Sequence, residues 1–132
     1  MSSSLVVVKT AETLKSNRIC VVYGHGGESV REAFAGQKIE WALQEPQLGT
    51  GHAVQQAMPF LPDTDIAVIM YGDVPLVLPE TIERLARAAQ KGPAILTVFE
   101  DDPKGYGRIV RDPAGAVAAI VEEKDADDDQ RR

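Results

Sequence analysis

Short apolar runs rich in β-branched residues alternate along this chain with segments of helical spacing, and this alternation restricts the fold more than any other feature. The runs predict strands at residues 18–23, 38–43, 65–71 and 94–99. Apolar residues three and four positions apart predict helices at 5–15 and 28–35, around 53–58, and from 79 to the Gly92-Pro93 pair. Strands that alternate with helices form βαβ units, so we expect an α/β domain with a mainly parallel sheet.

The pattern changes in the last quarter of the chain. Two short runs at 107–111 and 116–121 flank Asp112-Pro113-Ala114-Gly115, a turn sequence that predicts an antiparallel hairpin appended to the α/β core. Residues 125–132 contain one apolar residue, Ala126, and predict an acidic, frayed tail. We therefore expect a partial domain over 1–124 and a tail over 125–132.

Composition narrows the class of protein. With 132 residues, 44% of them apolar, the chain is long enough for one domain with a core. A net charge of -6 without a basic cluster argues against a nucleic-acid partner. The single cysteine, Cys20, lies in an apolar run and predicts a buried, reduced thiol in a cytoplasmic protein. No segment has the features of a signal peptide or membrane span, so no membrane association is expected.

The segment from Leu43 to Ala53 joins a predicted strand to a predicted helix. Gln44 offers an amide donor and acceptor, Gly49 lets the backbone approach a flat ligand, and Thr50 can cap the helix or donate a hydroxyl. A pyrimidine base presents a complementary donor and acceptor edge. The same residues are also consistent with an ordinary capped helix that has a glycine-rich entry.

Two further groups are candidates for ligand contacts. Asp73 follows a predicted strand, where a carboxylate can hold Mg²⁺ beside phosphates or can simply cap a turn. Gly107 lies in a glycine-flanked aromatic turn, and Glu122 could accept hydrogen bonds from sugar hydroxyls, although both patterns also suit a tight turn and a solvated charged run. His25 and His52 have no partners at metal spacing, which argues against zinc.

Five short motifs follow one another along the chain: VYGHGG at 22–27, LQ at 43–44 with QLGTGHA at 47–53, YGDVPL at 71–76, GYGRI at 105–109 and IVEEKD at 120–125. Each is weak alone. The ordered set resembles the N-terminal uridylyltransferase domain of the bacterial bifunctional UDP-N-acetylglucosamine pyrophosphorylase and glucosamine-1-phosphate N-acetyltransferase family. That resemblance implies a Rossmann-like nucleotide-diphospho-sugar transferase fold, the MobA-like NTP transferase domain.

The resemblance also implies an activity. The family joins UTP and N-acetylglucosamine 1-phosphate, with Mg²⁺, to give UDP-N-acetylglucosamine and pyrophosphate for peptidoglycan and lipopolysaccharide synthesis. The residues that the resemblance assigns are Gln44, Gly49 and Thr50 at the uracil, Tyr71, Gly72 and Asp73 at the ribose and phosphates with Asp73 on the metal, and Gly107 and Glu122 at the sugar. No residue is assigned to catalysis beyond the metal ligand.

Family members have parts that this sequence does not show. These are a first strand with a Gly-rich loop that clamps the triphosphate, later asparagines at the sugar and metal, and a left-handed β-helix acetyltransferase domain through which the family is expected to form homotrimers. We therefore expect an incomplete fold and an inactive chain when it is isolated.

Two alternatives remain. The chain could serve a nucleotidyltransferase with another base or sugar, or it could be a non-catalytic binding module on the same scaffold.

Overall fold

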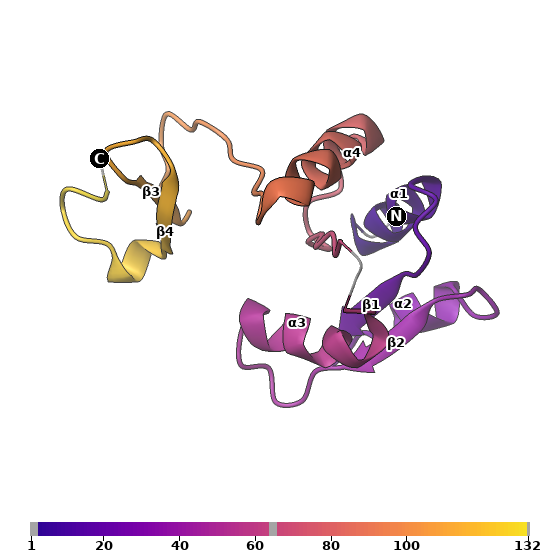
Figure 1. Ribbon diagram of the computed structural model, residues 1–132. Coiled ribbons are helices and arrows are strands. Elements are labelled where there is room, and N and C mark those ends of the chain that lie inside the picture. The colour runs from indigo at the N-terminus through magenta and orange to yellow at the C-terminus, as the bar shows by residue number, and fades with distance from the viewer. Residues whose placement is uncertain (1–2, 64–65, 132) are drawn as a thin grey trace. The chain divides into compact units, whose positions relative to one another are not determined.

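The two central strands lie side by side and parallel, as the alternating pattern predicts. The computed structural model describes residues 3–63 and 66–131 and divides the chain into two compact units, Met1–Ile95 and Leu96–Arg132. In the first unit, β1 (Cys20–Tyr23) pairs with β2 (Glu40–Leu43), with Cys20 opposite Glu40 and Tyr23 opposite Leu43 (Figure 1). The helix between them makes this a βαβ unit.

In the described part of the first unit, residues 3–63 and 66–95, four α-helices form, all at predicted places. They are α1 (Ser3–Thr13), α2 (Glu28–Ala33), α3 (Thr50–Ala57) and α4 (Pro79–Ala88), with 3₁₀ turns η1 (Met58–Phe60) and η2 (Ala89–Lys91) after the last two. Helix α1 ends earlier than predicted because Lys15 adopts a left-handed φ of 52°, which does not continue an α-helix. Helix α4 begins at Pro79, whose fixed φ and missing N–H suit the first turn.

The core of the first unit is small. Its buried side chains come from α1, the end of α2, β2 and α4: Val7, Val8, Phe34, Ala42 and Ile82. Phe34 is the largest, with 2% of its surface exposed. Helix α1 contacts α2 and α4, and α3 packs against both strands, so these contacts hold the βαβ unit and its flanking helices together.

Two predicted strands are not formed. Residues 66–71 and 94–99 form no strand ladder, and Asp65 lies outside the described residues. Ile66, Val68, Ile69 and Tyr71 are each more than a third exposed. The prediction of strands was wrong here because an apolar run sets only the local preference, whereas a strand also needs the hydrogen-bonding groups of a neighbour.

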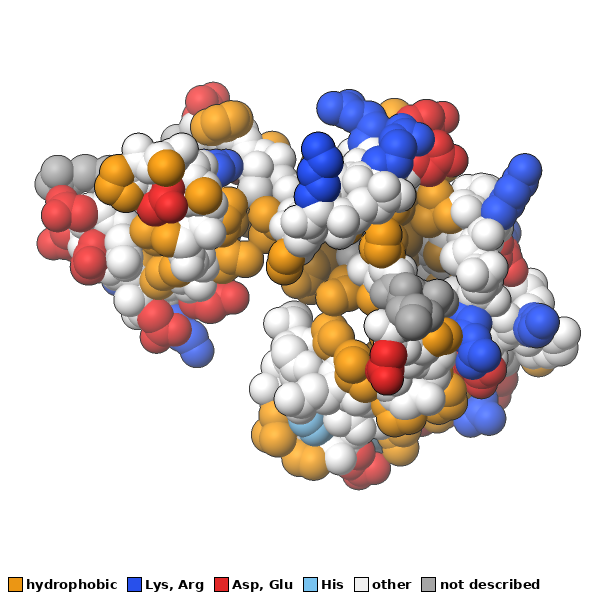
Figure 2. Space-filling model, in the orientation of Figure 1, with side chains coloured by type: hydrophobic (Ala, Val, Ile, Leu, Met, Phe, Trp, Pro, Cys, Tyr) orange, Lys and Arg blue, Asp and Glu red, His pale blue; other side chains and the backbone are white. Residues whose placement is uncertain are grey.

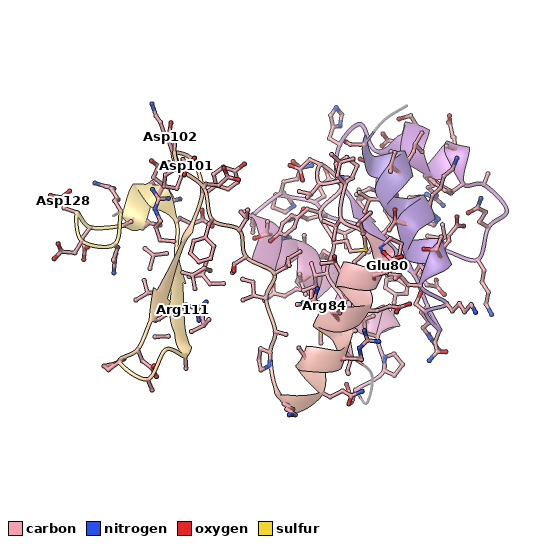
Figure 3. The ribbon with its side chains drawn as sticks, turned by 90° about the horizontal axis from the view of Figure 1, so that it is seen from above. Glu80, Arg84, Asp101, Asp102, Arg111 and Asp128 are labelled. Carbon is pink, nitrogen blue, oxygen red and sulfur yellow. The ribbon has the colours of Figure 1, made fainter. Side chains whose placement is uncertain are left out.

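The second unit contains the predicted hairpin. Strands β3 (Arg108–Arg111) and β4 (Val117–Val121) pair antiparallel, with a register shift between Val110 and Arg111, and η3 (Glu123–Asp125) follows. Figure 3 shows Arg111 on this hairpin and Asp101 and Asp102 on the loop before it.

The hairpin turn confirms the turn prediction. Gly115 adopts a φ of 86° and donates its N–H to the Asp112 carbonyl at 2.9 Å. The Asp112 carboxylate accepts from the Ala116 N–H, also at 2.9 Å, so the aspartate and the glycine together close the turn.

Apolar side chains remain on the surface of both units (Figure 2). In the first unit they include Leu76, which is 88% exposed, and Leu78. Over residues 3–63 and 66–131, no helix combines the length and apolar character needed to cross a bilayer.

Candidate functional site

The carboxyl ends of β1 and β2 open into two loops that touch each other. The Gln44 N–H donates to the Tyr23 carbonyl at 2.8 Å and extends the parallel pairing one step beyond the strands. A Cβ built on Gly24 would lie 1.6 Å from Gln47 Nε2, so the Gln47 amide occupies the space that any other residue at 24 would need. This is the edge at which open α/β sheets bind ligands.

The side chain of Gln44 is held within this edge. Its Nε2 donates to the Gly49 carbonyl at 2.9 Å and lies 3.2 Å from Nδ1 of His52. The amide nitrogen that was expected to serve as a donor to a ligand therefore faces two protein neighbours, the Gly49 carbonyl and the His52 ring. The oxygen Oε1 has no hydrogen bond within the described part of the chain, which leaves Gln44 an acceptor toward a ligand.

Gly49 and Thr50 form the entry to α3. Gly49 is the N-cap residue with a φ of 104°, a conformation that favours glycine. Thr50 is the first helical residue and makes no capping hydrogen bond, so the expected capping role of Thr50 is not seen. Its side chain is exposed beside Gly49, at the same edge as Gln44.

Two polar side chains of α3 complete this group and were not assigned a role from the sequence. His52 faces Gln44, and Gln56 Nε2 lies 3.1 Å from His52 Nε2 and 3.2 Å from the His52 carbonyl oxygen. The four-residue spacing of His52 and Gln56 on a helix could have suggested their contact. The contact with Gln44 depends on how α3 packs on the strands, and no sequence pattern shows that.

Tyr71, Gly72 and Asp73 lie in a turn of the first unit, closed by the Val74 N–H on the Tyr71 carbonyl at 3.2 Å. A Cβ on Gly72 would lie 3.2 Å from Oγ of Ser4, so this turn sits close to the start of α1. Asp73 is exposed and forms no hydrogen bond or ion pair with the described residues. No group of three or more His, Cys, Asp or Glu able to hold a metal occurs in residues 3–63 and 66–131.

Gly107 and Glu122 belong to the second unit. A Cβ added at Gly107 would lie 3.5 Å from the Val121 carbonyl oxygen, an ordinary van der Waals contact. The neighbouring Glu123, which the sequence did not single out, accepts a hydrogen bond from the Gly105 N–H. Arg108 donates to the Pro103 carbonyl at 2.9 Å and so ties the loop before the hairpin to β3.

The predicted site residues thus fall into three groups. Gln44, Gly49 and Thr50 are held together by hydrogen bonds and chain proximity, Tyr71 to Asp73 form a separate turn in the same unit, and Gly107 and Glu122 lie in the other unit. The first group alone has a side chain whose orientation is fixed by hydrogen bonds.

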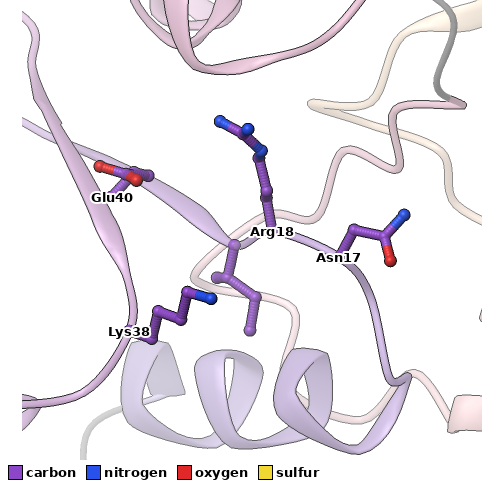
Figure 4. A pocket seen from close by; sticks show the side chains of 5 residues that line it. Asn17, Arg18, Lys38 and Glu40 are labelled. Carbon is purple, nitrogen blue, oxygen red and sulfur yellow. The ribbon is translucent and has the colours of Figure 1, made fainter.

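Two hollows of the surface lie away from these residues. One of about 390 Å³ is lined at the amino ends of β1 and β2 by Asn17, Arg18, Ile19, Lys38 and Glu40 (Figure 4). A second, of about 560 Å³, lies beside α2 and includes Phe34 and Trp41. Neither contains a predicted site residue.

Cys20 is partly buried, which fits the expectation of an apolar environment in part. Burial, and then the negative charge of Glu40 opposite it, raise the pKa of the Cys20 thiol.

Comparison with known proteins matches nearly the whole chain. The MobA-like NTP transferase domain family matches residues 5–130. A bifunctional protein GlmU from Azoarcus sp. (strain BH72) is 61% identical over 127 residues, which are 96% of this chain and 28% of the relative. Proteins of the same name from Alkalilimnicola ehrlichii and Xanthomonas campestris pv. campestris (strain 8004) are 51% and 54% identical, again over 96% of this chain and over 27% and 28% of their own lengths.

Proposed function

Because the chain belongs to the MobA-like NTP transferase domain family, we propose that it forms the uridine-binding part of a uridylyltransferase. The chain spans about 28% of the length of the relatives named bifunctional protein GlmU. One observation carries the proposal: Gln44 stands at the carboxyl edge of the parallel strands with its amide nitrogen anchored and its oxygen free. That arrangement supplies one fixed hydrogen-bond acceptor for a base.

The proposed reaction is a displacement at phosphorus. An oxygen of N-acetylglucosamine 1-phosphate forms a bond to the α-phosphorus of UTP, while the bond from that phosphorus to the oxygen bridging to the β-phosphorus breaks. The electron pair leaves with pyrophosphate, and UDP-N-acetylglucosamine remains. Such a reaction needs positioning and charge neutralisation, with no protein nucleophile. The product serves peptidoglycan and lipopolysaccharide synthesis.

In this proposal, each group of predicted site residues contacts a different part of the substrates. Gln44, Gly49 and Thr50 contact the uracil end, and the turn at Tyr71, Gly72 and Asp73 contacts the ribose and phosphates. In the second unit, Gly107 and Glu122 contact the sugar. Support for the first group is its fixed geometry, and support for the other two is the resemblance of their motifs.

Asp73 is suited to Mg²⁺. Its exposed carboxylate makes no competing hydrogen bond or ion pair within the described residues, and carboxylate oxygens are the ligands this ion prefers. Mg²⁺ in phosphoryl-transfer sites commonly takes one or two carboxylates and completes its shell with phosphates and water. When bound, the ion would neutralise charge on the phosphates, while Asp73 would hold it at the end of the 66–71 segment.

We further propose that residues 1–124 are part of one nucleotidyltransferase domain with an acidic tail over 125–132. We also propose a cytoplasmic location, which nucleotide-sugar substrates and a single, partly buried thiol support. A homotrimer would depend on an acetyltransferase domain of the family.

The experiment is a titration of the isotopically labelled chain with UMP, CMP and AMP, followed by chemical shifts of residues 44–53. We expect UMP to bind most tightly. Gln44→Ala should reduce UMP affinity by roughly fivefold, the equivalent of about 1 kcal/mol for one hydrogen bond. Gln90→Ala, an exposed glutamine of η2, is the matched control and should not change it. Equal shifts with all three nucleotides would refute base recognition at this edge.

A further inference from the structure

Three side chains form a connected polar chain behind the proposed base site. Gln44 Nε2 is 3.2 Å from His52 Nδ1, and Gln56 Nε2 is 3.1 Å from His52 Nε2. His52 and Gln56 come from one face of α3, while Gln44 comes from the loop after β2. His52 therefore stands between the two amides and contacts the one that faces the ligand edge.

The chemistry of a neutral imidazole decides which contact is fixed. The ring donates at one nitrogen and accepts at the other, so it cannot accept from two amide nitrogens at once. Turning over the Gln44 amide would place its oxygen 2.9 Å from the Gly49 carbonyl, acceptor against acceptor, which is a closer clash than Gln56 would meet at the His52 carbonyl, 3.2 Å away. The orientation of Gln44 is therefore the one more strongly kept, and in it Nδ1 of His52 accepts from Gln44 Nε2.

Gln56 is the amide that can turn. Its second contact is with the His52 carbonyl, which in an α-helix already accepts a backbone N–H from four residues further on. Turning the Gln56 amide brings its Oε1 to His52 Nε2–H and costs its contact with the His52 carbonyl, which at 3.2 Å is longer than the 2.9 Å contact that Gln44 would lose. In this tautomer the ring hydrogen of His52 lies on Nε2.

We propose that His52 is a positioning residue that selects the base. By accepting from Gln44 Nε2 at Nδ1, it holds the amide so that only Oε1 faces the ligand. A base with an N–H at the contacted ring position, as uracil has at N3, can donate to that oxygen. Cytosine has a lone pair at N3 and would meet Oε1 as a second acceptor. This selection rests on the proposed uridine site.

A purely structural role for His52 predicts a different result from the positioning role. If the ring only packs α3 against the loop, its removal should weaken the binding of all nucleotides alike. The size of that effect should then be the same whether the new side chain places a polar atom near Nδ1 or near Nε2. If it positions Gln44, the ratio of UMP to CMP affinity should change, and a side chain with an acceptor near Nδ1 should preserve that ratio.

The direct test is NMR spectroscopy of the ¹⁵N-labelled 132-residue chain. We expect a nitrogen–nitrogen coupling across the hydrogen bond between Gln44 Nε2 and His52 Nδ1, with the His52 proton on Nε2. Absence of that coupling overturns the positioning role, whether or not the chain prefers uridine.

Three variants test the selection itself. His52→Asn places its Oδ1 near the position of Nδ1 and should keep the preference for UMP over CMP. His52→Gln places its polar end near Nε2 and should lower that preference by roughly 5- to 10-fold, the loss of one anchoring hydrogen bond. Gln55→Ala, on the exposed face of the same helix, is the control and should leave the preference intact.

The outcomes separate this proposal from the uridine site. If His52→Gln keeps the preference, or if His52→Asn loses it equally, His52 does not select the base, although the uridine site stands. If the wild-type chain shows the coupling and binds UMP and CMP equally, the uridine site and the selection are both overturned. Coupling in the wild type, with the preference lost in His52→Gln alone, supports the proposal.

Discussion

Replacing Gln44 by glutamate reverses the hydrogen-bonding character of the atom that anchors the loop. The carboxylate oxygen in the place of Nε2 would face the Gly49 carbonyl at 2.9 Å and His52 Nδ1 at 3.2 Å. Both neighbours are acceptors when His52 carries its proton on Nε2. The substitution keeps the size of the side chain, so its effect comes from the two lost hydrogen bonds and from the repulsion that replaces them.

The expected magnitude follows from those two contacts. A hydrogen bond in a protein contributes about 1 kcal/mol net, so the pair contributes about 2 kcal/mol to the free energy of unfolding of the first unit. The hydrogen bond to Gly49 is exposed to solvent, so a much larger loss is not expected. With a urea dependence of about 2 kcal/mol per molar, the unfolding midpoint should fall by about 1 M.

Trp41 provides the assay. It is the single tryptophan, lies on β2 three residues before Gln44, and contacts the Tyr23 ring at a centroid distance of 6.0 Å, so its fluorescence reports on this part of the first unit. Gln90→Glu makes the same charge change at an exposed position and serves as the control. A Gln44→Glu midpoint equal to that of Gln90→Glu would show that the amide anchor does not stabilise the fold.

Three further predictions concern the metal, the thiol and the loop contact. Mg²⁺ should bind weakly without nucleotide because Asp73 is a single carboxylate, and Asp73→Asn should weaken Mg²⁺ binding further. If calorimetry gives the same Mg²⁺ affinity for the wild-type chain and the variant, Asp73 is not part of the metal site. Alkylation of Cys20 should require a higher pH than alkylation of a free thiol, because the raised pKa of Cys20 keeps the thiol protonated. Glu40→Gln removes a negative charge and should lower the pH at which Cys20 reacts. An unchanged pH–rate profile in this variant would contradict the influence of Glu40 on the pKa. Gly24→Ala should displace the Gln47 amide, whose Nε2 would lie 1.6 Å from the new Cβ, with a stability loss of about 1 kcal/mol or less because a flexible exposed side chain can move. That loss should vanish in a Gln47→Ala background, and a loss that persists there would point to backbone strain instead.

Local signals predicted much of the secondary structure. Pro79 starts α4 at the predicted position, and the Asp112 to Gly115 turn joins β3 to β4 as expected. Both outcomes depend on residues within a few positions of one another, where backbone restrictions and side-chain capping act without help from the rest of the chain. The order of strand and helix around β1 and β2 was predictable for the same reason.

Local sequence signals could not predict which strands pair or which side chains meet across the fold. Residues 66–71 and 94–99 have strand composition and are still unpaired, because a ladder depends on where distant backbone groups lie. From the sequence alone, Gln44 could be named as a candidate for base recognition and Thr50 as a possible cap. Gly49 is the cap residue instead of Thr50, because glycine holds a φ of 104° without the steric penalty that a threonine would meet.

The sequence by itself determined which residue types stand at the carboxyl ends of β1 and β2, and their motifs were sufficient to indicate a nucleotidyltransferase family. Tertiary structure decided what those residues can offer. Packing of α3 on the strands brings His52 to Gln44, and that contact, with the Gly49 carbonyl, occupies both amide hydrogens. A glutamine that could donate or accept in isolation is left with its oxygen alone, since a hydrogen bond made within the protein is no longer available to a ligand.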